Sequence, residues 1–327
     1  MKSSYVIGID IGGTRVKSGA VAAGGALLAR STEPTGFAMK TDALVQSLED
    51  RVRHIIHALG ASPAYIALGL SGAVDPDMGV VLLPGKLQVE GFPLVPSLRE
   101  RTGLPVIADN DGRLSMLAEA RYGQARNQQW AVTITLGTGV GSGVMLDGRV
   151  LRDPRLQFGT QASHIVQEAH SDRLCITRAR GTANILCSAT ALAMAVRDGL
   201  LRGLPSVLNE AFFNDPNSID FEAVIRGVEA GDALCQDALE RWTTSLGWFL
   251  TSIVHMYAPE IIILSGGATN AADHFLDQVR AHVNNHTFRY PLADEIRIVR
   301  TELTDYAGVL GAAALAWQQV ERQEELR

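Results

Sequence analysis

Three glycine-rich turns in this sequence have the composition of a phosphate-binding site. Each follows a short apolar run that reads as a buried strand, and two of the three carry a threonine. Glycine lets backbone N–H groups converge without a Cβ in the way, and a threonine hydroxyl adds a donor, so such a turn can hold an anion. A hairpin without a ligand explains any one of them, but the three together with the neighbouring Asp10 favour nucleotide binding. The turn residues are Gly12, Gly13 and Thr14, then Gly137, Thr138 and Gly139, and finally Gly266 and Gly267.

Two aspartates stand where a carboxylate could take part in phosphate chemistry. Asp10 lies beside the first glycine turn, and a carboxylate close to phosphates needs a metal ion to offset the like charge. Otherwise Asp10 caps the turn. Asp111 could act as a general base that accepts the proton of an attacking hydroxyl group. It could equally be the N-cap of the helix that follows, a role that Asp109 and Asn110 could also fill, and the spacing leaves this alternative open.

Several familiar signatures are absent from the sequence. No G-x-x-x-x-G-K-[ST] phosphate loop occurs, and the glycines between 137 and 143 alternate at every second position, unlike the dinucleotide-binding G-x-G-x-x-G. The segment Gly69-Leu70-Ser71-Gly72 misses the G-x-S-x-G nucleophile motif by one position, and there is no H-E-x-x-H. These absences exclude the common nucleotide-binding, hydrolase and metalloprotease motifs.

The elements that must position these residues alternate between strands and helices, which is typical of an α/β fold. The helical pattern is clearest over 41–59, where apolar residues recur every three or four positions. The strand–turn–strand units at 6–19 and 132–143 share one plan, so two related subdomains are expected. Strands are predicted at 5–9, 16–21, 26–30, 66–70, 106–108, 130–136, 140–146, 261–264 and 296–299. Helices are predicted at 41–59, from the 109–111 cap region to 122, at 271–285 and at 307–322, with mostly helical structure over 188–257.

Size and composition limit the class of protein. A chain of 327 residues fits two domains around a cleft better than one domain, and 46% hydrophobic with 20% charged residues is ordinary for a soluble globular protein. A net charge of −6 without a dense Lys/Arg block argues against nucleic acid as a partner. No run approaches the roughly 18–20 apolar residues that span a bilayer. Three cysteines cannot make a disulfide framework, so a cytoplasmic protein without a membrane partner is expected.

Four motifs spread along the chain are specific when taken together. They are Asp10-Ile11-Gly12-Gly13-Thr14, Asn110-Asp111 through Gly123, Leu136 through Gly143, and Ser265-Gly266-Gly267. In this combination the chain resembles the ROK family (repressors, open reading frames and sugar kinases) over nearly its whole length. The resemblance implies an α/β fold of the actin-like ATPase (ribonuclease H-like) type, with two α/β domains and a central cleft. The smaller domain is expected to hold residues 1–112 and 308–327, and the larger one residues 113–307.

The resemblance also implies roles for individual residues. Asp10 would work with Mg²⁺, the glycine turns would hold the phosphates of ATP, and Asp111 would be the catalytic base. Asn110 would bind the sugar. Gly72 would lie beside the sugar pocket, in a turn similar to the family's Gly-x-Pro-Gly with Ser71 in place of Pro. The cofactors are then ATP and Mg²⁺, the partner is a small-molecule sugar, and a homodimer is expected because dimers are common in the similar family.

Two family motifs are altered here, and both alterations concern the sugar pocket. The family's Gly-Glu-x-Gly-His becomes Thr160-Gln161-Ala162-Ser163-His164, so Gln161 replaces a sugar-binding glutamate and His164 remains. The family's zinc loop falls on residues 175–184. Only Cys175 persists of its three cysteines, and Asn184 replaces a second sugar-binding glutamate. His164 and Cys175 are two possible ligands where a structural zinc needs four, so no zinc is predicted.

The expected function is ATP-dependent phosphorylation of a hydroxyl group of a hexose or modified hexose. Amides at Gln161 and Asn184 bind sugar hydroxyls more weakly than carboxylates, which favours a sugar other than plain glucose. The alternative is a non-catalytic sugar or nucleotide sensor descended from a kinase. Transcriptional repression is not expected, because repressor members carry a helix-turn-helix domain before the first glycine turn, and here that motif begins at Asp10.

Overall fold

The chain divides into two α/β units. The computed structural model describes residues 4–12, 15–35, 41–75, 78–83, 91–152, 161–288, 294–303 and 305–326. Unit 1 comprises Met1–Gln128, Gly143–Thr160 and Thr301–Arg327, and unit 2 comprises Gln129–Ser142 and Gln161–Arg300.

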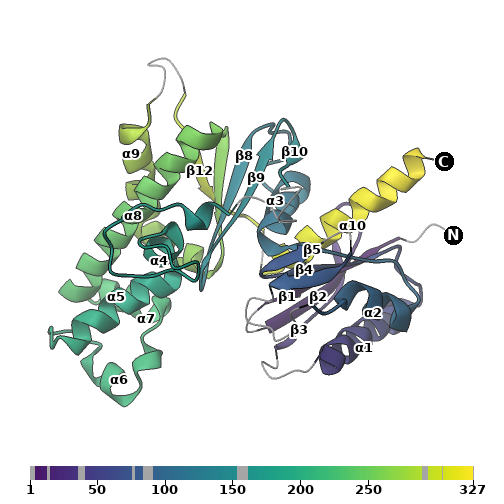
Figure 1. Ribbon diagram of the computed structural model, residues 1–327, viewed down its shortest axis with the longest axis horizontal. Coiled ribbons are helices and arrows are strands. Elements are labelled where there is room, and N and C mark those ends of the chain that lie inside the picture. Colours follow the sequence, from purple (N-terminus) through teal and green to yellow (C-terminus); the bar gives the residue numbers. More distant parts are fainter. Residues whose placement is uncertain are drawn as a thin grey trace. The chain divides into compact units, whose positions relative to one another are not determined.

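The sheet of unit 1 joins an antiparallel hairpin to three parallel strands (Figure 1). Its strands are β1 Val6–Ile11, β2 Arg15–Val21, β3 Leu27–Pro34, β4 Ile66–Leu70 and β7 Val106–Asn110, and a small separate sheet pairs β5 Ala73–Asp75 with β6 Val80–Leu83. The order is β3-β2-β1-β4-β7, in which β1, β4 and β7 run parallel. Strands β1 and β4 are buried almost throughout, as their Val, Ile and Leu content predicts for a sheet covered on both faces.

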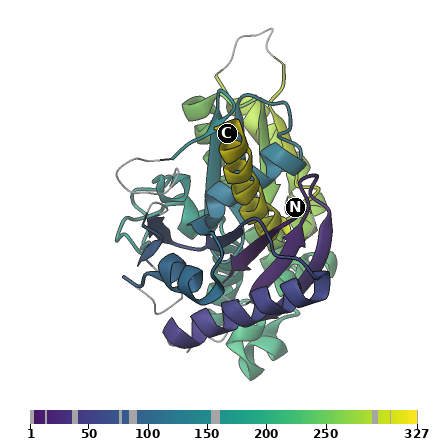
Figure 2. The same cartoon turned by 90° about the vertical axis from the view of Figure 1, so that its right-hand side faces the viewer.

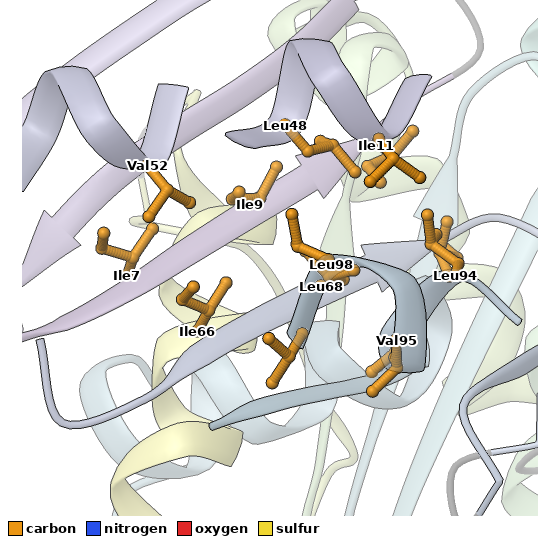
Figure 3. Close-up of a cluster of buried hydrophobic side chains, with 14 of the residues drawn as sticks. Ile7, Ile9, Ile11, Leu48, Val52, Ile66, Leu68, Leu94, Val95 and Leu98 are labelled. Carbon is orange, nitrogen blue, oxygen red and sulfur yellow. The ribbon is translucent and has the colours of Figure 1, made fainter. Parts of the chain in front are cut away.

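Helices cover both faces of this sheet. On one face lie α1 Thr41–Leu59 and α2 Leu94–Thr102, and on the other lie α3 Asp111–Tyr122 and α10 Ala307–Glu325. Figures 1 and 2 show α1 and α10 on opposite sides of the strands. Because side chains alternate along a strand, β1 serves both cores. Ile7, Ile9 and Ile11 point toward α1 and α2 (Figure 3), whereas Val6 packs with α3 and α10.

Helix α10 lies unusually close to β1 and α3. A Cβ added to Gly8 would overlap the carbonyl oxygen of Val309, and one added to Gly311 would lie 2.7 Å from the carbonyl carbon of Leu114. Real Cβ atoms essentially never approach a neighbour more closely than 3.0 Å, so both positions require glycine. This packing fixes the first turns of α10 against β1, the strand that carries Asp10 near its end.

The second sheet contributes most of its strands to unit 2. They are β8 Ala131–Leu136, β9 Val140–Leu146, β10 Arg149–Val150, β11 Ile261–Ser265 and β12 Arg297–Arg300. The order is β10-β9-β8-β11-β12, and β8, β11 and β12 run parallel. The boundary between the units falls inside β9, between Ser142 and Gly143.

One long helix forms the centre of the helical part of unit 2. The helices are α4 Ala183–Cys187, α5 Ala189–Leu201, α6 Asn209–Asn214, α7 Phe221–Glu229, α8 Ala233–Tyr257 and α9 Leu276–His286, with 3₁₀ helices η1 Ala162–His164, η2 Pro216–Ser218 and η3 Gly267–His274. Helix α8 packs against α4, α5, α7 and α9, so most of the apolar face predicted over 242–257 is buried inside unit 2. Among the described helices, α8 included, none is long and apolar enough to cross a bilayer.

The helix predicted at 271–285 is wrong in its first part. The 3₁₀ helix η3 ends at His274 and α9 begins only at Leu276, because Phe275 between them leaves helical geometry (φ −144°, ψ −23°). The Phe275 ring is buried 5.1 Å from the ring of Trp242, measured between centroids, so tertiary packing sets the break. The helix predicted at 41–59 and the strand at 66–70 are confirmed with the same bounds.

Candidate active site

The carboxyl ends of three parallel strands meet at one edge of the sheet in unit 1. In the register of β1, β4 and β7, Asp10 lies opposite Gly69 and Leu70 lies opposite Asn110. Ligands of open α/β sheets bind outside these strand ends. The edge therefore brings together four residues that the sequence predicts for the site: Asp10, Gly72, Asn110 and Asp111.

Asn110, and not Asp111, is the N-cap of α3. Its side-chain oxygen accepts hydrogen bonds from the N–H groups of Gly112 (2.9 Å) and Arg113 (3.4 Å), and its amide nitrogen donates to the Gly72 carbonyl at 2.8 Å. Asp109 is engaged elsewhere, because its carboxylate accepts from the buried Arg113 guanidinium at 3.0 Å. The alternative left open by the sequence is thereby decided, and capping does not explain the carboxylate of Asp111.

The Asp111 carboxyl group is exposed at the start of α3. Although solvent reaches it, the surrounding protein desolvates the carboxylate and the charge of Asp10 lies nearby, and together these raise the pKa of Asp111 to about 7. A hydrogen bond from the Gly112 N–H, at 2.8 Å, acts in the opposite direction. A base works best when its pKa lies near the operating pH, so Asp111 is suited to accept a proton at neutrality.

Asp10 is partly buried between β2 and the start of α10. Burial raises the pKa of its carboxyl to about 6, and the charge of Lys17 partly offsets that rise. Lys17 lies opposite Asp10 in the β1–β2 hairpin and donates to the Asp305 carbonyl at 2.6 Å. A Cβ on Gly308, in the first turn of α10, would lie 2.5 Å from Asp10 Cγ. The absence of a side chain at 308 therefore leaves room for the Asp10 carboxylate.

Sequence reasoning missed Lys17 and Gly308. Counting pairs outward from the glycine turn would have placed Lys17 beside Asp10, because cross-strand partners share a face of the sheet. No local signal points to Gly308, since its contact with Asp10 arises only when α10 returns to β1 from the far end of the chain.

The donor set at this edge fits a magnesium ion. Two neighbouring carboxylates with raised pKa values repel each other, and a divalent cation would relieve that repulsion. Magnesium is commonly held by one or two carboxylates together with water and substrate phosphates. Asp10 could supply that protein share, next to the carboxylate of Asp111. In the described part of the chain, no group of three or more His, Cys, Asp or Glu side chains could hold a metal.

The first glycine turn is only partly described. Gly12 donates its N–H to the Arg15 carbonyl at 3.0 Å, and its own carbonyl accepts from the Thr35 hydroxyl at 2.8 Å. These bonds close the base of the turn next to Asp10. Gly13 and Thr14, both predicted to bind phosphate, lie outside the described residues.

The other two glycine turns meet at the corresponding edge of the sheet in unit 2. Strands β8 and β11 are parallel neighbours, and the hydroxyls of Thr135 and Ser265 lie 2.9 Å apart at their ends. Gly266 follows with φ +90°, and a Cβ there would lie 2.8 Å from the carbonyl carbon of Leu136. The structure thus brings Gly266 and Gly267 beside the turn of Gly137, Thr138 and Gly139, as a shared phosphate site requires.

The side chain of Asn184 is hydrogen-bonded to the end of the Gly137–Gly139 turn. Its side-chain oxygen accepts the N–H of Val140 at 2.9 Å, and a Cβ on Gly139 would lie 2.8 Å from the same oxygen. Gly137 itself donates to the Gly139 carbonyl at 3.0 Å. The oxygen of Asn184 is therefore engaged with the turn, which leaves its amide nitrogen as the group that could meet a substrate hydroxyl.

Gln161 precedes the short helix η1, and His164 is its last residue. Gln161 is exposed, and the next residue, Ala162, donates its N–H to the Ser142 hydroxyl of β9 at 3.1 Å. The His164 ring is partly buried, which lowers its pKa, and Nδ1 lies 3.4 Å from the Cys175 sulfur. The structure therefore brings together the two possible zinc ligands that the sequence leaves, one from each altered motif.

The segment that carries Cys175 is ordered by hydrogen bonds within the protein. Isolated antiparallel bridges pair Val166 with Thr182 and Leu174 with Arg180. The Arg173 guanidinium also forms an ion pair with Asp198 of α5 at 2.7 Å. These contacts hold the segment against itself and against α5.

Comparisons with known proteins find relatives that match nearly the whole chain. The sequence pattern of the "ROK family" matches residues 6–319. The chain is 28% identical over 327 residues to a glucokinase of Thermotoga maritima, covering 98% of this chain and 99% of that protein.

Two solved structures share the fold along almost the whole chain. They are a ROK hexokinase from Thermus thermophilus (26% identity, TM-score 0.79, 97% of this chain and 99% of that one) and a ROK family glucokinase from Streptomyces griseus in complex with glucose and AMPPNP (24% identity, TM-score 0.80, 96% and 99%). They confirm the actin-like α/β fold that the sequence led us to expect. With a family match that covers nearly every residue, this chain belongs to the ROK family.

Proposed function

We propose that this protein is an ATP-dependent kinase that phosphorylates a hydroxyl group of a hexose or modified hexose. Membership of the ROK family and the likeness to a glucokinase support the reaction class. The observation that carries the proposal is Asp111, an exposed carboxylate with a pKa near 7 that the N-cap does not use.

Asp111 would act as the general base. A sugar hydroxyl is a weak nucleophile at neutral pH, and a positioned carboxylate can take its proton while the γ-phosphoryl group is transferred. Asn110, held by Gly72 and by the N-terminus of α3, would orient the acceptor sugar next to that carboxylate. Magnesium held by Asp10 would neutralise phosphate charge. Gly12 to Thr14 and Gly137 to Gly139, with Gly266 and Gly267, would bind the phosphates.

The residues of unit 2 would set the choice of sugar. Gln161 and Asn184 offer neutral amides where the similar family has carboxylates, and an ionised acceptor binds a hydroxyl more strongly than a neutral one. The oxygen of Asn184 already accepts from Val140, which reduces its capacity for sugar hydroxyls further. These features support a substituted hexose over plain glucose, with His164 as a remaining polar contact. The lack of a structural zinc and a homodimeric assembly remain predictions of the same account.

The test is a coupled ATP-consumption assay over hexoses and modified hexoses with Mg²⁺. We expect turnover with at least one sugar in the wild type and a loss of about 10²- to 10⁴-fold in kcat in Asp111→Asn. Asp147→Asn, at an exposed turn on the same unit, is the matched control and should keep full activity. Sugar-dependent thermal stabilisation without turnover above the Asp111→Asn level would instead establish the non-catalytic sensor.

A further inference from the structure

Arg113 forms a buried ion pair next to the cap of α3. Its Nε donates to both carboxylate oxygens of Asp109, at 3.1 and 3.0 Å. Asp109 is 2% exposed and Arg113 is 7% exposed. Because the cost of desolvating two charges can exceed their Coulomb attraction, such a pair is weak evidence for stability. The pair is better explained by what it fixes in the local structure.

Without Arg113, the Asp109 carboxylate would compete for the N-terminus of α3. Aspartate and asparagine are about equally good N-caps, and Asp109 directly precedes the actual cap, Asn110. In the structure both oxygens of Asp109 are engaged by Nε of Arg113, and one of them also accepts the Asn110 N–H at 2.8 Å. The N–H groups of the first turn are therefore left to Asn110.

The choice of cap determines the backbone directly before the carboxylate of Asp111. As the N-cap, Asn110 has an extended conformation (φ −68°, ψ 141°), and Asp111 is the first residue of the helix. If Asp109 were the cap, Asn110 would take helical angles, with ψ of about −42°. A change of that size in the torsion before Asp111 would turn its carboxylate away from its present direction.

A second set of hydrogen bonds fixes the guanidinium group itself. Nη1 of Arg113 donates to the carbonyl groups of Val150 and Leu151, at the end of β10. These carbonyls belong to the backbone of unit 1, as do Asp109 and the whole of α3. The Arg113 side chain thus connects the ends of β7 and β10 with the first turn of α3.

We infer that Arg113 is a positioning residue for the general base, because it engages Asp109, keeps Asn110 as the cap of α3 and so fixes the direction of the Asp111 carboxylate. The inference rests on the proposed function, in which Asp111 accepts the proton of the sugar hydroxyl. Arg113 itself acts through the helix start and touches no reacting atom.

The experiment is a double-mutant cycle between positions 109 and 113, with kcat measured well below the Tm of each variant. Arg113→Met frees the Asp109 carboxylate, so kcat per folded molecule should fall by about tenfold to 10²-fold, as expected for a misplacement on the order of 1 Å. In Asp109→Leu/Arg113→Met no competing carboxylate remains, and kcat should return to within about threefold of the wild type. A purely stabilising ion pair would leave kcat per folded molecule unchanged in every variant.

Two further variants complete the cycle. Arg113→Gln keeps a donor but no charge, so it should change kcat in the same direction by a smaller factor, and it replaces Arg113→Met if that variant does not fold. Arg51→Met, which removes another buried guanidinium of unit 1 from its ion pair with Glu33, is the matched control and should keep the wild-type kcat.

Crystal structures of the same variants need no turnover, so they separate this inference from the proposed function. Residue 110 should adopt helical angles in Arg113→Met, with Asp109 as the cap, and should remain extended in the double variant. An Asn110 that still caps α3 in Arg113→Met, or a loss of kcat that persists undiminished in the double variant, would overturn the inference. The expected structures together with a wild type that turns over no sugar would instead overturn the proposed kinase activity.

Discussion

Replacing Gly308 by alanine is expected to slow phosphoryl transfer while leaving the fold intact. The new methyl group would lie 2.5 Å from Asp10 Cγ and closer still to one carboxylate oxygen, whereas ordinary contacts begin at 3.4 Å. Either α10 or the carboxylate must move by about 1 Å. Helix α10 is held against β1 and α3 by the close approaches at Gly8 and Gly311, so the Asp10 side chain is the part that yields.

The displacement allows a rough estimate of the effect. A misplacement of about 1 Å in a reacting geometry can cost about 10²-fold in rate, so kcat should fall by about that factor. Alanine also favours helix over glycine by about 0.5–1 kcal/mol, which offsets part of the crowding, so the free energy of unfolding should change by less than about 1 kcal/mol. Activity and stability are therefore expected to separate in this variant.

The assay is the coupled ATP-consumption rate as a function of Mg²⁺ concentration, with urea unfolding on the same samples. We expect a lower kcat and a weakened response to Mg²⁺ in Gly308→Ala. Gly24→Ala is the matched control, because a Cβ at Gly24 meets nothing within 4 Å. A Gly308→Ala enzyme that is folded and keeps the wild-type kcat and Mg²⁺ dependence would refute the placement of Asp10 in the catalytic machinery.

Three further outcomes are expected. The pKa of Asp111 is raised from 3.8 to about 7 in the folded protein, so ionisation of this carboxyl group lowers the stability of the fold as pH rises from about 4 to 7. The Tm of Asp111→Asn should therefore exceed that of the wild type by more at pH 8 than at pH 5, and an equal difference at the two pH values would contradict the raised pKa. Asn110→Ala should lower the free energy of unfolding by about 1 kcal/mol through loss of the cap; Asn110→Ser should recover most of it in urea titrations. Gly267→Ala meets nothing within 4 Å, so calorimetry should show an unchanged Tm while the KM for ATP rises; an unchanged KM would remove Gly267 from the phosphate site.

Local sequence patterns were sufficient for most of the elements that carry the site. Short continuous apolar runs and turn glycines predicted β1, β4 and β11, and the polar cluster before α3 predicted its start. Which of three polar residues caps α3 could not be predicted, because Asp109, Asn110 and Asp111 are all good caps. The choice depends on Arg113, which engages Asp109, and on Gly72, which engages Asn110.

Contacts between distant segments account for what the sequence could not supply. The break at Phe275 depends on Trp242, and the room for Asp10 depends on Gly308. His164 and Cys175 were recognised as a pair only through the resemblance to a family motif. Their hydrogen bond follows from how the 165–183 segment folds back on itself.

The pH dependence of single-turnover phosphoryl transfer, in the wild type and in Asp111→Asn, tests the proton-accepting role of Asp111 most directly. With saturating MgATP and sugar, the wild-type rate should rise about tenfold per pH unit on the acid side. The rate should level off near pH 7, the pKa of Asp111. A Mg²⁺ ion bound at Asp10 would offset the negative charge of Asp10 and so move this plateau to lower pH. The Asp111→Asn rate should be flat and about 10²- to 10⁴-fold slower. An Asp111→Asn variant that keeps the wild-type rate and the same acid limb would show that another group removes the proton.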